Sequence, residues 1–137
     1  MWGLMLSRRL SGFSVAVLVA SLSGCGGGGD QVSLVSASKC LVSIDSATAD
    51  FATPLHEAMS GGAVRVILPT NEVQIGFGKD GAEANEMGDE VRQGVSGTIA
   101  ARNYPSNELV AVRRNVVLAW KAPPTEQERT DVESCVE

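Results

Sequence analysis

The glycines at positions 76, 78 and 81 have the spacing of a dinucleotide-binding loop. Residues 76–81 read GFGKDG, which follows the strand-like sequence VQI and precedes a helical pattern. In such a loop the glycines permit a tight turn, and pyrophosphate meets the N-terminus of the helix. Here Asp80 would bring a negative charge to the phosphates, and Arg102 and Asn103 stand where an acidic residue should end the next strand. We therefore predict a glycine-rich loop that binds no nicotinamide or flavin.

His56 is the only histidine of the chain. The sequence HEAMS places Ser60 where an H-E-x-x-H zinc site needs its second histidine, and a single histidine makes a poor transition-metal site. A Ser-His-Asp triad can form from residues far apart in sequence, so a small exported hydrolase that uses His56 stays an alternative. No nucleophile-elbow motif is present, and we expect His56 on a helix surface with no catalytic residue in the chain.

An acidic cluster between residues 80 and 90 could suggest a calcium site. Helical spacing spreads these side chains around the axis, and no Asp-x-Asp loop gathers their oxygens. We expect a solvated helix face and no bound metal. The acidic residues are Asp80, Glu83, Glu86, Asp89 and Glu90.

Arg113, Arg114 and Trp120 could also mark a ligand surface. Two neighbouring residues on a strand point to opposite faces, so the arginines form no nucleic-acid patch. Trp120, near the end of a β-like run, is expected to fill the core.

The N-terminal residues resemble a bacterial lipoprotein signal peptide. Arg8 and Arg9 precede an uncharged run, residues 10–22, that is too short to span a bilayer. The sequence Leu-Ser-Gly-Cys at positions 22–25 matches the lipobox at every position. The resemblance implies that residues 1–24 are removed and that Cys25 carries a diacylglyceryl thioether and an acylated amine. Ser7-Arg8-Arg9-Leu10 also fits the start of a twin-arginine export signal, although Ser11 stands where an aromatic residue is usual.

The mature chain would be strongly acidic. Removal of Arg8 and Arg9 leaves nine basic residues against sixteen acidic ones, a formal charge of −7. Such a surface repels nucleic acid and anionic headgroups, so attachment to a membrane depends on the acyl chains. Gly26, rather than aspartate, follows Cys25. The resemblance therefore implies the periplasmic face of the outer membrane in a Gram-negative cell, or the outer face of the cell membrane in a Gram-positive one.

Cys40 and Cys135 are the two cysteines that lipidation leaves free. They stand at opposite ends of the expected domain, in an oxidising compartment. We predict that they form a disulfide that closes almost the whole domain; two separate buried thiols are the alternative.

The chain divides into three parts: the signal peptide over residues 1–24, a lipidated cysteine and flexible glycine-rich tether over 25–38, and a small domain over 39–137. An edge strand that begins at residue 32 is the alternative for the end of the tether.

The expected domain is α+β. Alternation predicts strands over 40–45, 64–68, 73–77, 97–102 and 109–120, the last broken by a bulge or bend at residues 113–115. Helices are expected after the Thr53-Pro54 cap, after the Asp80 and Glu83 capping pair, and after the Thr125 and Glu128 capping box. The first six elements fit a ferredoxin-like βαββαβ pattern, with an extra strand and a C-terminal helix.

These features predict an exported, membrane-anchored lipoprotein with a non-catalytic binding or envelope-assembly module. Its partners would be the membrane, through the lipid on Cys25, and an envelope protein or a small ligand. The hydrolase alternative requires a cleft of polar groups around His56.

Overall fold

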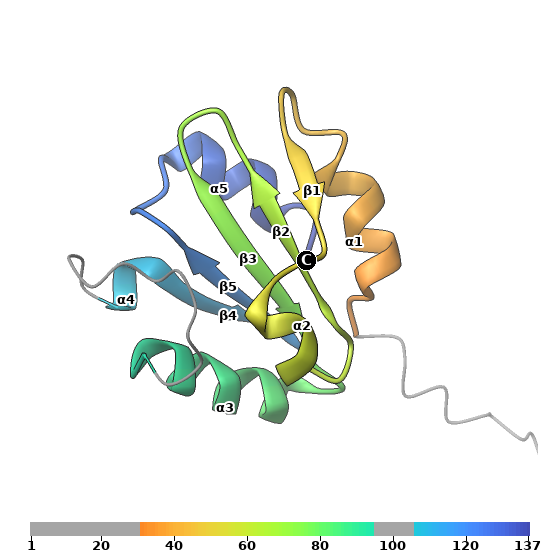
Figure 1. The fold of residues 1–137 in the computed structure, drawn as a ribbon, viewed down its shortest axis with the longest axis vertical. Helices are drawn as coiled ribbons and strands as arrows, with labels where there is room; N and C mark the ends of the chain where they lie inside the picture. The colour runs from red at the N-terminus through yellow and green to blue at the C-terminus, as the bar shows by residue number, and fades with distance from the viewer. Residues whose placement is uncertain (1–30, 95–105) are drawn as a thin grey trace, which may run out of the picture.

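The computed structural model describes residues 31–94 and 106–137. This part of the chain folds into one five-stranded antiparallel sheet with helices on both faces (Figure 1), so the α+β class is confirmed. The strands are β1 (Thr48–Asp50), β2 (Ala63–Ile67), β3 (Glu72–Phe77), β4 (Val110–Arg113) and β5 (Val116–Trp120). The helices are α1 (Leu34–Leu41), α2 (Pro54–Ala58), α3 (Gly81–Arg92), α4 (Ser106–Leu109) and α5 (Glu126–Glu133).

The strand order, β1-β2-β3-β5-β4, contains one split βαβ unit. β3 and β4 are parallel, because each pairs antiparallel with β5, which lies between them, and α3 lies in the connection. β1 and β2, by contrast, form a neighbouring antiparallel pair. The described strands therefore contain one of the two split units that a ferredoxin-like fold combines. The strand predicted over residues 97–102 lies outside the described residues.

The predicted strand over residues 40–45 is wrong. Cys40 lies in the last turn of α1, and hydrogen-bonded turns follow up to residue 47. Alternation over six residues is only a weak signal for a strand. The burial of α1 against the sheet determines the conformation of this segment instead.

The predicted tether over residues 25–38 extends too far, because the fold begins before residue 39. The Ser33 side chain accepts a hydrogen bond from the Ser36 backbone and caps α1, and Ala37 and Leu41 are fully buried. The edge strand that was the alternative for this segment is absent for the same reason. The remainder of the tether, up to residue 30, lies outside the described residues.

The expected break at residues 113–115 is a full reversal of the chain. Arg113 pairs with Val116 across a two-residue turn, in which Arg114 has φ of 54°. Arg114 therefore lies in the turn of a β4–β5 hairpin, and the prediction that Arg113 and Arg114 point from opposite faces of a strand is wrong. The other predicted hairpin is confirmed, because Ile67 pairs with Glu72 across residues 68–71, which read LPTN.

Three of the predicted helix starts are confirmed. Pro54 begins α2, and the Asp80 side chain caps α3 by accepting a hydrogen bond from the Glu83 backbone. Thr125 and Glu128 form the predicted capping box of α5.

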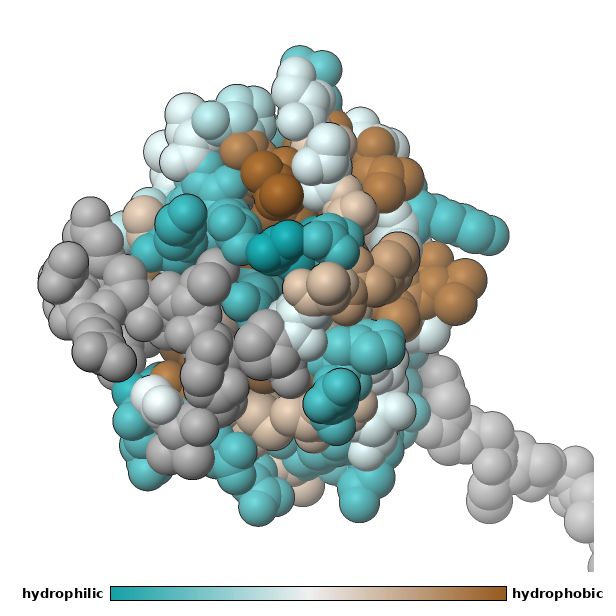
Figure 2. All heavy atoms as spheres, viewed as in Figure 1, coloured by the Kyte–Doolittle hydropathy of each residue, from teal (hydrophilic) through white to brown (hydrophobic). Residues whose placement is uncertain are grey.

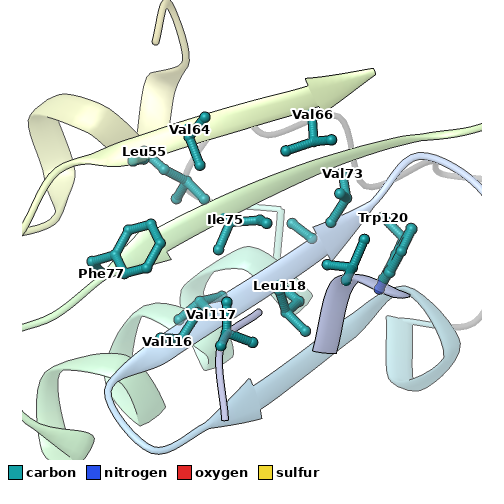
Figure 3. Close-up of a cluster of buried hydrophobic side chains, with 14 of the residues drawn as sticks. Leu55, Val64, Val66, Val73, Ile75, Phe77, Val116, Val117, Leu118 and Trp120 are labelled. Atoms are coloured by element: carbon teal, nitrogen blue, oxygen red, sulfur yellow. The ribbon is translucent and has the colours of Figure 1, made fainter. Parts of the chain in front are cut away.

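The two faces of the sheet are covered by different helices (Figure 1). α2 and α3 cover one face: a Cβ at Gly76 would come within 2.9 Å of Met59, and one at Gly88 within 2.6 Å of Val112. The other face carries most of the core, and α1 and α5 cover it. Figure 3 shows this cluster, which includes Val64, Val66, Val73, Ile75, Phe77, Val116, Leu118 and Trp120.

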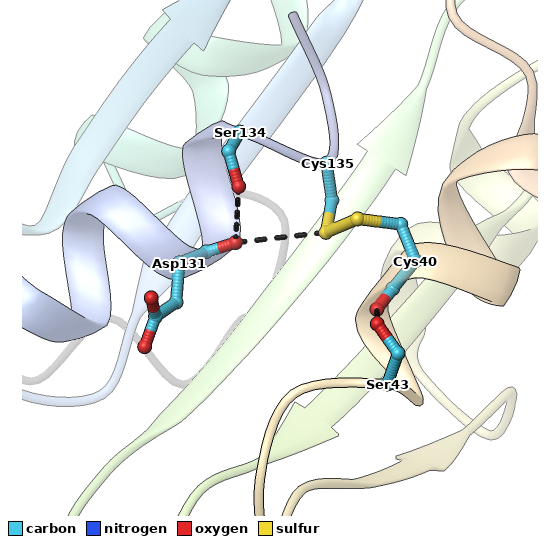
Figure 4. The surroundings of a disulfide bond; sticks show 5 residues. All are labelled: Cys40, Ser43, Asp131, Ser134 and Cys135. Carbon is cyan, nitrogen blue, oxygen red and sulfur yellow. Dashed lines mark hydrogen bonds between the residues drawn. A yellow bond between two sulfur atoms is a disulfide. The ribbon is translucent and has the colours of Figure 1, made fainter.

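A disulfide between Cys40 and Cys135 joins the end of α1 to the residues that follow α5 (Figure 4), with a Cα–Cα distance of 5.4 Å. The two cysteines are 95 residues apart in the sequence. The bond therefore fastens the N-terminal helix to the C-terminal end of the chain on the same face of the sheet.

We predict that this bond contributes much of the stability of the domain. In the chain-entropy model a crosslink over a loop of this length stabilises by up to about 4.7 kcal/mol, and typical values are about 2–4 kcal/mol. The double substitution Cys40→Ala/Cys135→Ala should lower the free energy of unfolding in urea by that typical amount. A reductant should destabilise the wild type equally and leave the double variant unchanged. Equal stability of oxidised wild type and variant would contradict the prediction.

Candidate functional site

The candidate site is the place where the N-terminal segment joins the domain. Cys25, the predicted lipidation site, lies outside the described residues. The described chain begins at residue 31, and Val32 is the first residue that the domain holds by long-range hydrogen bonds.

Asn115, in the β4–β5 turn, makes this attachment. Its side-chain oxygen accepts a hydrogen bond from the Val32 N–H at 2.8 Å, and its amide nitrogen donates to the Val32 carbonyl at 3.0 Å. The same nitrogen donates to the Gly78 carbonyl at 2.8 Å, and the Gly78 N–H donates to the Asn115 carbonyl. Asn115 is 3% exposed, so one buried amide connects the N-terminal segment, the β4–β5 turn and the β3–α3 loop.

The glycine-rich loop needs glycines because its backbone packs closely against neighbouring parts of the chain. A Cβ at Gly76 would collide with Met59, one at Gly78 would lie 3.1 Å from the Asp80 carbonyl, and one at Gly81 would lie 3.3 Å from the Arg114 carbonyl. Each glycine therefore permits a close approach of the chain to itself.

Carboxylates already occupy the backbone N–H groups of Lys79 in this loop and of Glu83 in the first turn of α3. Glu83 accepts hydrogen bonds from the Lys79 N–H at 2.7 Å and from the N–H and hydroxyl of Ser60, both at 2.8 Å. Asp80 accepts from the Glu83 N–H at 2.9 Å. A phosphate at this loop would meet two carboxylates, which supports the prediction that no dinucleotide binds here.

Glu83 is the titratable group that this loop perturbs. Partial burial raises the pKa of Glu83, but the hydrogen bonds from Lys79 and Ser60 outweigh it, and the pKa lies below its ordinary value of 4.5.

His56 lies exposed on α2, as predicted. Its Nδ1 atom is 3.2 Å from the backbone nitrogen of Ala63 and 3.3 Å from the Ala63 carbonyl oxygen, at the start of β2. Among the described residues, no serine hydroxyl or carboxylate forms a hydrogen bond with it. The imidazole thus contacts the backbone of Ala63, and no residue of the described part of the chain forms a triad with it.

Four of the five acidic residues, together with Lys79 and Ser60, line a hollow of about 560 Å³; they are Asp80, Glu83, Glu86 and Glu90. Within residues 31–94 and 106–137, no three His, Cys, Asp or Glu side chains are placed to hold a metal ion.

A row of alternating charges crosses β1, β2 and β3 and ends at Lys121, the residue after β5, on the face that α2 and α3 cover. Arg65 forms ion pairs with Asp50 and, at 3.8 Å, with Glu72; Lys121 lies 3.7 Å from Glu72. Hydrogen bonds from the Ala52 N–H and the Arg65 guanidinium lower the pKa of Asp50. The two acidic and two basic residues neutralise one another, so the row is a network of structural ion pairs rather than a binding site for a single ion.

Trp120 fills the core, as predicted, with 2% of its surface exposed. Arg113, at the end of β4, forms an ion pair with Glu133 at 3.4 Å.

Sequence reasoning missed Asn115 and α1. A buried asparagine has no sequence signature when its partner, Val32, is 83 residues away. The signal for α1 was present: Ser33 is a good N-cap, and Leu34, Ala37 and Leu41 have helical spacing.

In comparisons with protein-family models, with curated proteins and with solved structures, nothing matches this chain. In the part that the structure describes, no helix is both long enough and apolar enough to cross a bilayer.

Asn115→Ala should loosen the N-terminal segment, because it leaves the Val32 N–H and the Val32 and Gly78 carbonyls without their partner. We expect the free energy of unfolding to fall by about 1–3 kcal/mol and amide exchange in α1 to accelerate. Asn85→Ala is the matched control: Asn85 is exposed and makes one hydrogen bond within α3. Equal effects of the two substitutions would show that Asn115 has no special role.

Glu83 should make the domain acid-sensitive. Because the folded pKa lies below the ordinary value of 4.5, its contribution to stability is complete above that pH and is lost as the pH falls through the folded pKa. Unfolding in urea at pH values between 7 and 3 should show a shallower loss of stability for Glu83→Gln than for the wild type. Glu86→Gln, an exposed change on the same helix, should keep the wild-type slope. A wild-type slope in Glu83→Gln would refute this assignment.

Proposed function

We propose that this chain is an exported lipoprotein, held at a membrane through lipid on Cys25, whose domain acts by binding an envelope component. The lipobox at residues 22–25, with the signal-peptide pattern before it, supports the anchor. The attachment of Val32 by Asn115 is the structural observation that carries the proposal, because it sets how far the domain can lie from the anchor.

Only six residues lie between Cys25 and Val32, so seven Cα–Cα steps join the two. A fully extended chain of that length reaches at most about 25 Å. The domain is then confined within a few nanometres of the membrane surface, which raises its effective concentration towards membrane and wall components, so a weak contact can be occupied. An enzyme with a diffusible substrate gains less from such confinement.

The binding function is favoured over the hydrolase because the polar side chains that could act in catalysis already bind backbone groups of the fold. The imidazole of His56 contacts the backbone of Ala63, and the carboxylate of Glu83 binds the amides of Ser60 and Lys79. In both cases a side chain with catalytic potential already has a structural task.

Crosslinking in intact cells tests this function. The wild type should yield a recurrent crosslinked partner and should incorporate a fatty-acid analogue. Cys25→Ala should lose the label and most of the crosslinked product, whereas Ser23→Ala, which keeps a small residue in the lipobox, should retain both.

Two results would overturn the proposal. Label that persists in Cys25→Ala would refute the anchor. Turnover of a substrate by the untethered domain, abolished in a folded His56→Ala variant, would replace binding with the hydrolase alternative.

A further inference from the structure

Helix α1 has apolar residues on two sides. Ala37 and Leu41 point into the core and are fully buried. Val35 in α1 and Val42, its C-cap residue with helical backbone angles, are 68% and 56% exposed. They are two of the four large hydrophobic side chains that are exposed in the described part of the chain. Their spacing of seven residues places them on one side of the helix, about 130° from the buried side.

Lys39 lies between these two valines. Positions 35, 39 and 42 differ by four and three residues, so their side chains form a single stripe along the helix. Lys39 is exposed and has no ion-pair partner among the described residues. We call Val35, Lys39 and Val42 the α1 stripe. In Figure 2 hydrophobic residues lie along the side of the molecule that α1 occupies in Figure 1.

The α1 stripe begins three residues after Val32, the point of attachment. The chain from Cys25 to Val32 can extend at most about 25 Å. If Cys25 is acylated, this short connection holds the face with the α1 stripe close to the lipid surface.

We propose that the α1 stripe docks onto the membrane to which Cys25 anchors the chain; this inference rests on the proposed function. The valines enter the headgroup region, and the Lys39 ammonium lies over lipid phosphates while its methylene stem covers the apolar surface. A basic residue within an apolar stripe suits this occupant, because the mature chain as a whole carries a net negative charge that anionic lipid repels.

The contact itself is small. Two partly exposed valines and one lysine would not hold a soluble protein on a bilayer, but the anchor makes the contact intramolecular. The consequence is orientation: the face with α2 and α3 is directed away from the membrane, towards other envelope components.

The test uses the full chain, purified from membranes and reconstituted in phosphatidylethanolamine and phosphatidylglycerol vesicles whose acyl chains are brominated. Val42→Trp reports on the α1 stripe, because bromine quenches tryptophan fluorescence only at short range. Ile67→Trp is the control: Ile67 is 42% exposed, on β2, and on the opposite face of the sheet. Native Trp120 is buried and gives a constant background, and Trp2 is absent once residues 1–24 are removed.

We expect the Val42→Trp signal to fall by at least a third in brominated relative to ordinary vesicles, and the Ile67→Trp signal to stay within a tenth. Adding Lys39→Glu to Val42→Trp should reduce the quenching at least twofold. Circular dichroism verifies that each variant is folded.

Flotation of the vesicles and the mass of the protein separate the two possible failures. An acylated chain that floats, with no quenching in Val42→Trp or with equal quenching in Ile67→Trp, overturns the docking and leaves the anchor intact. A chain without acyl groups overturns the anchor and the docking together.

Discussion

The burial of β3 on both faces is the constraint on which the rest of the structure depends. Val73, Ile75 and Phe77 point to one side, and Gln74 and Gly76 to the other, and all five are buried. Helices must therefore cover both faces, and a chain of this size has few residues to do so. α1 closes one face, and the disulfide from its last turn keeps it there.

The same constraint links the fold to the proposed function. Since α1 is needed to cover the sheet, the domain begins at Val32 and leaves only a short connection to Cys25. Asn115 fixes the point where this connection meets the domain. The second half of the predicted tether thus belongs to the folded domain, and under the proposed function this gives the domain a defined side towards its anchor.

Local chemistry made part of this fold predictable. The hairpin of β2 and β3 and the caps of α3 and α5 each depend on residues that are close in sequence. The disulfide could be predicted because lipidation of Cys25 leaves only two of the three cysteines. The strand expected at residues 40–45 and the long tether were wrong because tertiary burial outweighs short alternation. Asn115 could not be found, because its role depends on partners, Val32 and Gly78, that only the folded chain brings to it.

The intact mass of the chain extracted from the membrane fraction tests the central claim most directly. The account predicts a chain that begins at Cys25, carries diacylglycerol and an amide-linked acyl group, and gains two alkyl groups only after reduction. A chain that retains residues 1–24, or that lacks acyl groups, would contradict the anchor on which the proposed orientation and function rest.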